Sequence, residues 1–190
     1  MVLFGERTAL PDNWTVEKLF HKRKALNQGE SVILDASPIR EGFLVDTSYS
    51  FCFGENEIHR HMMSHLSYYR ESIPKAVNQG VTFKQIVTNV IDNMITHSYA
   101  PAHTKHIGEF LGHCAVKLGR LPIKPRVRGF DGFAISWFKL KGKLATSGLG
   151  RRSPPWNTLK ASEHLHYDEL WLVEPHAGKD GGGAKCGENF

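Results

Sequence analysis

Apolar residues recur at steps of three and four along two neighbouring segments, which is the spacing of an amphipathic helix. The first segment runs from about Glu57 to Val77, and Pro74 is expected to kink or end that helix. The second runs from Phe83 to about Thr96, with Thr82 as the expected N-cap. The residues expected to face the core are Ile58, Met62, Leu66, Tyr69, Ile73 and Val77 in the first helix and Phe83, Ile86, Val87, Val90, Ile91 and Met94 in the second.

A different pattern, in which apolar and polar residues alternate, predicts strands before these helices. Residues 29–36 (GESVILDA) fit a turn and a strand, and residues 41–54 (EGFLVDTSYSFCFG) fit its hairpin partner, with Pro38 to Gly42 as the connection. A later apolar strand, Glu169–Pro175, leads into a glycine-rich end. With a further helix expected over residues 14–27, the pattern predicts a mixed α+β domain.

The composition narrows the class of protein. The chain has 190 residues, of which 41% are hydrophobic, and this is enough for one domain with a core. No run approaches the roughly 18 apolar residues of a membrane span, and the charged N-terminus does not resemble a signal peptide. The net charge of +5 includes one dense basic run, Lys124–Gly129, but no nucleic-acid-binding motif accompanies it, so we expect a solvated surface there.

The three cysteines, Cys52, Cys114 and Cys186, are odd in number and lack CxxC spacing. They therefore predict neither a disulfide framework nor a zinc ribbon, and a reducing cytoplasm is the simplest setting.

Two aspartates, Asp35 and Asp46, stand within apolar strand sequence. A buried carboxylate is costly unless it is paired, hydrogen-bonded or bound to a metal. Because the two residues are eleven positions apart on strands joined by a short turn, we expect them to lie side by side. Two carboxylates at close range repel each other unless a cation or a proton lies between them. Asp46, taken alone, could instead end a strand or cap a turn.

Three further residues could complete a site. His106 and His113 flank a glycine-containing loop, and Glu174 ends the later apolar strand. Taken singly, His106 could be a core histidine bonded to the backbone, and Glu174 an exposed strand end. Together with the aspartates they offer oxygen and imidazole ligands without a thiolate, which suits Mn, Co, Fe or Zn. Two metal ions would explain why so many carboxylates converge.

Residues 26–55 (LNQGESVILDASPIREGFLVDTSYSFCFGE) resemble the pita-bread metallopeptidase family, which includes methionine aminopeptidase, aminopeptidase P, prolidase and the non-peptidase creatinase. Three later segments also resemble the family's motifs: KHIGEFLGH at 105–113, LWLVEPHAG at 170–178 and GGGAKCGE at 181–188. The resemblance covers residues 26–190. The positions that match in order and spacing near the start are Gly29, Asp35, Gly42, Phe43, Asp46, Thr47 and Ser48.

The resemblance implies a partial pita-bread fold, a mixed sheet covered by helices. It implies one metallopeptidase-like catalytic domain over residues 1–190 that lacks much of the family's first half-domain. It also implies two divalent metal ions. The implied ligands are Asp35 to one ion, Asp46 as a bridge, His106, Glu174 and Glu188, with His113 binding substrate or stabilising the tetrahedral intermediate and Glu174 handling the water proton.

The chain departs from the family's pattern at two of these positions. Glu109 stands where the histidine loop normally has glycine, so the register could favour His103 or His113 as the ligand instead of His106. Gly187 stands at the position of the last glutamate ligand. Either Glu188 takes that role through a small shift, or the last ligand is missing.

The function that the resemblance implies is that of a metal-dependent hydrolase of the aminopeptidase or Xaa-Pro peptidase type. In such an enzyme a metal-activated water attacks the amide carbonyl of a peptide or small amide. One alternative is a creatinase-like C–N hydrolase that works without metal. Another is a degenerate, catalytically inactive member that serves as a binding module. We expect no nucleic-acid or membrane partner, and a homo-oligomer or a completing chain is an open alternative.

Overall fold

A computed structural model gives the structure of the chain. The helix expected over 14–27 lies mostly outside the residues it describes, and positions 25–27 at the end of that stretch are not helical. His106 also lies outside them. The described residues are 2–10, 25–105, 111–117, 126–127, 130–131 and 170–189.

The predicted hairpin of residues 29–54 is present and forms part of an antiparallel sheet. The sheet has the order β1 (Val2–Phe4), β2 (Ser31–Ala36) and β5 (Thr47–Cys52), and the 3-10 helix η1 (Gly5–Ala9) follows β1. The connection between β2 and β5 contains more structure than expected. It forms a second short hairpin of β3 (Ile39–Arg40) and β4 (Phe43–Leu44), and β4 also pairs with β8 (Val116–Lys117).

Both predicted helices are confirmed. The helix α1 spans Glu57–Asn78 and α2 spans Phe83–Thr96, and Thr82 accepts a hydrogen bond from the N–H of Gln85 as the N-cap of α2. Pro74 does not end α1, because the helix continues to Asn78.

One residue of the expected apolar stripe of α1 is placed differently. Ile58 is 38% exposed, and the neighbouring His59, which is 5% exposed, takes the inward position.

The glycine-rich end forms strands that the sequence pattern did not predict. The expected strand at 169–175 is shorter, as β11 (Trp171–Val173), and lies between β7 (Gly112–Cys114) and β14 (Glu188–Asn189). After it, β12 (His176–Lys179) pairs with β13 (Gly182–Lys185) and with β6 (Ala100–Pro101). The remaining described elements are η3 (Ala102–Lys105), β9 (Arg126–Val127) and β10 (Phe130–Asp131).

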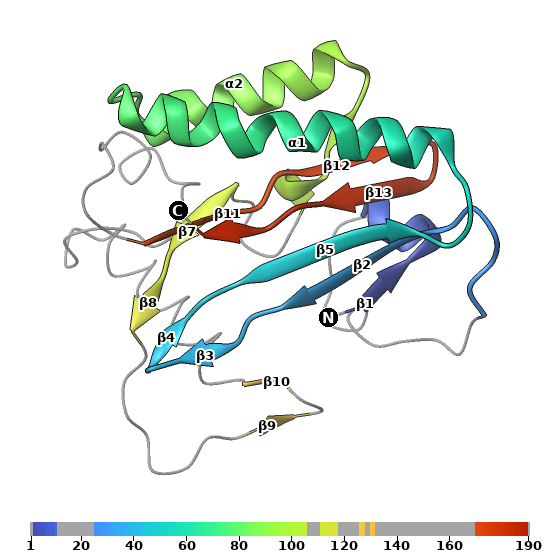
Figure 1. Ribbon diagram of the computed structural model, residues 1–190, viewed down its shortest axis with the longest axis horizontal. Helices are drawn as coiled ribbons and strands as arrows, with labels where there is room; N and C mark the ends of the chain where they lie inside the picture. Colours follow the sequence, from blue (N-terminus) through green and yellow to red (C-terminus); the bar gives the residue numbers. More distant parts are fainter. Residues whose placement is uncertain are drawn as a thin grey trace.

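The two helices lie on the same side of the strands, with α1 running along β12 and β13 (Figure 1). The main core fills the space between α1, α2 and the C-terminal strands, and its fully buried members include Leu66, Phe83 and Leu111. The other side of β13 contacts β2, β5 and η1. The result is the mixed α+β architecture that the pattern predicted, with β13 at its centre. None of the helices in the described ranges is long and apolar enough to cross a membrane.

Close contact between β13 and η1 depends on Gly183. A Cβ atom at this position would lie 2.1 Å from the backbone oxygen of Thr8, so no larger residue fits. The backbone N–H of Gly183 also donates to Oγ1 of Thr8 at 2.7 Å. Through these contacts η1 packs against β13, and β13 brings its last residue, Lys185, beside β5.

Candidate metal centre

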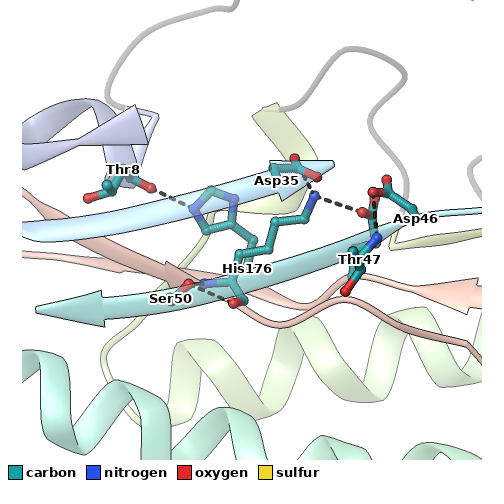
Figure 2. Close-up of polar contacts among 8 residues, drawn as sticks. Thr8, Asp35, Asp46, Thr47, Ser50 and His176 are labelled. Carbon is teal, nitrogen blue, oxygen red and sulfur yellow. Dashed lines mark hydrogen bonds and ion pairs between the residues drawn. The ribbon is translucent and has the colours of Figure 1, made fainter. Parts of the chain in front are cut away.

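Three buried carboxyl groups converge from separate parts of the fold. Asp35 lies in β2 opposite Ser48 of β5, Asp46 lies directly before β5, and Glu174 lies directly after β11. The aspartates come together because β2 and β5 pair as an antiparallel hairpin, which is the strand pairing that the sequence pattern predicted. Figure 2 shows the side chains of Asp35 and Asp46 near one another at this end of the hairpin.

Asp46, His113 and Glu174 form a cluster of possible metal ligands. One ligand atom from each lies within 4.8 Å of the others, and all three residues are buried. His113 joins the cluster because β7 pairs with β11, where His113 lies opposite Leu172, two residues before Glu174. Nδ1 of His113 lies 3.0 Å from the carbonyl oxygen of Cys114. A carbonyl only accepts, so Nδ1 donates, and Nε2 is the ring nitrogen able to act as a ligand.

A buried lysine completes the group of charges. Nζ of Lys185 lies 2.9 Å from Oδ2 of Asp35 and 2.7 Å from Oε1 of Glu174. The backbone of Lys185 is fixed by Ser50, whose hydroxyl donates to the carbonyl oxygen of Lys185 at 2.7 Å and accepts from its N–H at 2.8 Å. Figure 2 shows the contacts from Ser50 and those that reach Asp35.

Burial and neighbouring charges shift the pKa values of the cluster. Burial, followed by the charge of Glu174, raises the pKa of Asp46 from 3.8 to about 10. Burial alone would raise the pKa of Glu174, but the ammonium of Lys185 and a hydrogen bond from Asp46 hold it below its usual value. Burial also lowers the pKa of His113. Without a metal ion, Asp46 therefore holds a proton and donates it to an ionised Glu174, beside a neutral His113.

Lys185 remains charged despite its burial. Desolvation would lower its pKa, but the carboxylates of Glu174 and Asp35 raise the pKa above its usual value. The sequence interpretation gave Lys185 no role. The sequence does mark Lys185 as unusual, because it is the single charged residue in the run GGGAKCG. A lysine is rarely buried among small residues unless its charge is paired.

The structure brings some predicted ligands together and separates others. Asp46, His113 and Glu174 share one cluster, whereas Asp35 is held by Lys185. His103 is buried in η3 and is not a member of the cluster that the described residues form.

Gly187, which stands where the family pattern has its last glutamate ligand, offers no ligand side chain. Gly187 pairs with Ser48 as an isolated β-bridge, and a Cβ at Gly187 would lie 2.7 Å from Oγ of Ser48. The backbone of Glu188 lies opposite Val173, while its side chain is outside the described part of the structure. The role assigned to Glu188 therefore stays a prediction.

Solved structures with a similar fold are peptidases. A dipeptidase from Pyrococcus horikoshii matches with a TM-score of 0.63 and 17% identity, over 100% of this chain and 42% of its own. A prolidase from Thermococcus sibiricus matches with a TM-score of 0.61 and 14% identity, over 100% and 41%. An X-Pro aminopeptidase from Thermotoga maritima matches with a TM-score of 0.59 and 19% identity, over 100% and 42%. At these identities the likeness shows the fold, and the chain spans less than half the length of these proteins.

The sequence comparisons agree with the fold. No curated protein sequence matches the chain. Residues 1–123, which include Asp35, Asp46 and His113 but end before Glu174 and Lys185, match metallopeptidase family M24. This match covers more than half of the chain, and the partial pita-bread fold is the one that the sequence motifs implied. The chain belongs to metallopeptidase family M24.

Proposed function

We propose that the chain is a metal-dependent hydrolase of amide bonds, of the aminopeptidase or Xaa-Pro peptidase type, with a divalent cation bound by Asp46, His113 and Glu174. The observation that carries the proposal is the convergence of these three buried residues within 4.8 Å. Membership of family M24 supports the reaction class. The fold likeness to a prolidase and an X-Pro aminopeptidase supports a peptide substrate.

The chemistry of the three side chains fits one divalent cation. Two carboxylates and an imidazole offer oxygen and nitrogen ligands, the set expected for Mn, Co, Fe or Zn in place of a thiolate-rich structural zinc site. The carboxyl groups of Asp46 and Glu174 are hydrogen-bonded to each other, so a proton or a cation must lie between them. Binding of a divalent cation would displace that proton.

Each residue has a specific task in this proposal. A divalent cation bound there would polarise an amide carbonyl and make a bound water more acidic. His113 would bind the cation through Nε2, with its ring held by the hydrogen bond from Nδ1 to Cys114. Glu174 has Oε1 against Lys185, so Oε2 is the oxygen that would bind the cation. This assigns His113 to the cation, whereas the family resemblance implied a substrate-binding role.

Metal content and peptide hydrolysis test the proposal together. The purified chain would be analysed for bound Mn, Co, Fe and Zn and then assayed on Xaa-Pro dipeptides and on peptides with other N-terminal residues. We expect bound metal and hydrolysis in the wild type, and loss of both in Asp46→Ala. His97→Ala is the matched control, because His97 is exposed at the end of α2 and should leave both unchanged. A folded wild type that binds none of these metals would overturn the proposal.

The alternative of a catalytically inactive or metal-free member has two observations in its favour. Gly187 supplies no side chain where the family pattern has its last glutamate ligand, and Lys185 already neutralises part of the carboxylate charge. Such a protein would keep the fold and bind peptides without hydrolysing them. Metal-free hydrolysis of a small C–N substrate would instead indicate a creatinase-like enzyme. Equilibrium binding of a non-hydrolysed peptide to the metal-free chain separates these two outcomes.

The cellular setting and the assembly remain proposals as well. We propose a reducing cytoplasm as the setting, because Cys52, Cys114 and Cys186 are odd in number and lack CxxC spacing. A homo-oligomer or a completing chain is consistent with the partial coverage of the structural relatives, and sedimentation of the purified protein tests it.

A further inference from the structure

Lys185 has an environment in which lysine is rarely found. Its side chain is 3% exposed, and its ammonium group contacts two carboxylates that come from different elements, Asp35 in β2 and Glu174 after β11. An ammonium buried without partners would be very costly, so a lysine is retained at such a position only when acidic groups compensate its charge. The two short contacts provide that compensation. The ammonium group of Lys185 therefore supplies a positive charge within this site.

The position of Nζ between two carboxylates is the arrangement that a bridging cation would adopt. At 2.9 Å from Asp35 and 2.7 Å from Glu174, it joins a buried aspartate outside the three-residue cluster to a glutamate that belongs to the cluster. The charge of Lys185 also acts on Asp46. A divalent ion placed between Asp35 and Glu174 would have to share this space with the ammonium group, and like charges at such distances repel strongly in a protein interior.

The lysine is held in this place by the fold. Oγ of Ser50 bonds both the N–H and the carbonyl oxygen of Lys185, at 2.8 Å and 2.7 Å, so the residue that carries the ammonium is tied to β5. Gly183, two residues earlier, packs closely against the backbone of Thr8 and donates its N–H to Oγ1 of Thr8, which joins β13 to η1. The ammonium is thus directed at the carboxylates by buried contacts on both sides of the strand.

We propose that the ammonium group of Lys185 takes the place of a second divalent cation, so that Asp35 serves as its counter-ion and the site binds a single metal ion. The inference rests on the proposed function for the ion at Asp46, His113 and Glu174, and adds that the second position is filled by the protein itself. Gly187, which stands where the family pattern has its last glutamate ligand, offers no side chain to a second ion, and this agrees with the inference.

The test is the number of ions bound per chain, measured by titration calorimetry and by the visible absorption of bound Co²⁺. We expect one Co²⁺ per wild-type chain. In Lys185→Met the side chain keeps about the same length but loses its charge. We expect this variant to bind a second Co²⁺ with an affinity at least about tenfold higher than that of the wild type for a second ion. Asp35→Asn should leave the wild-type count at one. Lys179→Met is the matched control, because Lys179 lies on the neighbouring strand β12 over the ring of Tyr99 and should not alter the count.

The outcomes separate this inference from the proposed function. Two ions per wild-type chain would overturn the inference, and this measurement needs no variant. An unchanged count and affinity in a folded Lys185→Met would overturn it too. No ion in the wild type and one in Lys185→Met would overturn the proposed function but support the lysine as the cation of the site. If Lys185→Met folds only when Co²⁺ is added, the metal ion has replaced the ammonium group as the cation beside the buried carboxylates. This result also supports the inference.

Discussion

Nζ of Lys185 donates a hydrogen bond to Oδ2 of Asp35 at 2.9 Å, across 150 positions of sequence. Both side chains are buried, so the pair joins β2 to β13 in a part of the fold with little access to water. A buried ion pair adds little net stability compared with apolar residues of the same size, but the loss of one partner leaves an uncompensated buried charge. The two residues should therefore depend strongly on each other.

A double-mutant cycle measures that dependence. In metal-free buffer, Asp35→Asn should lower the free energy of unfolding by about 3 kcal/mol, because Lys185 loses one of the two carboxylates that its ammonium group contacts. Lys185→Met should cost more, since it removes the ammonium charge from beside both carboxylates. The double variant should lose less than the sum of the two changes, as measured by urea unfolding. Single effects that add to within about 0.5 kcal/mol would show that the residues are not coupled.

His59 should make the protein less stable as the pH falls below neutrality. Its Nδ1 lies 2.9 Å from Oγ of Ser31, and burial lowers the pKa of His59 below its ordinary value of 6.5. The unfolded chain therefore takes up a proton near pH 6.5 that the folded chain takes up only at lower pH. Acid thus favours the unfolded state over this range.

The measurement is the free energy of unfolding in urea between about pH 7.5 and pH 5.5, a range that brackets the unfolded pKa of histidine. Burial lowers the pKa of His65 and His113 in the same direction, whereas the raised pKa of Asp46 acts in the opposite direction, so the wild-type slope is a sum. His59→Gln removes one acid-destabilising contribution and should reduce the loss of stability on acidification. An identical slope in the two proteins would show that His59 does not contribute.

The helices could be predicted from the sequence because their signals are local. The bounds of α2, Phe83–Thr96, follow from the apolar spacing and from the N-cap at Thr82. The misplaced residue, Ile58, lies in the first turn of α1, where the inward position is decided by a tertiary contact: His59 reaches Ser31 in β2. Periodicity alone cannot detect such a contact.

The candidate site could be predicted only in part, for the same reason. Asp35 and Asp46 were expected to be neighbours because a short hairpin brings them together. Lys185 was missed because its partners are far away in sequence, and because β12 and β13 consist largely of small residues without a clear alternation. The pairing that decides the role of Asp35 is thus visible only in three dimensions.

The N-cap of α1 makes a further prediction about stability. Oδ1 of Asn56 accepts from the N–H of His59 at 3.0 Å, and Nδ2 of Asn56 donates to the carbonyl oxygen of Gly29 at 2.8 Å. Asn56→Ala removes both bonds and should lower the free energy of unfolding by about 1–2 kcal/mol. Thr82→Ala is the matched comparison, because Thr82 caps α2 through one longer bond of 3.3 Å, and it should cost less. Equal losses in urea unfolding would mean that the bond to Gly29 adds nothing.

Gly183 should be the glycine least able to accept a side chain. A Cβ there would meet the backbone oxygen and carbon of Thr8 at 2.1 Å and 2.5 Å, and backbone atoms cannot move aside as a flexible side chain can. Gly183→Ala should therefore lower the free energy of unfolding by about 3 kcal/mol, toward the upper range for overpacking. Gly178→Ala is the control, since its Cβ would come no closer than 3.3 Å to Ala9. If both variants unfold at the same urea concentration, η1 can move away from β13, and the close packing at Thr8 does not hold Lys185 in place.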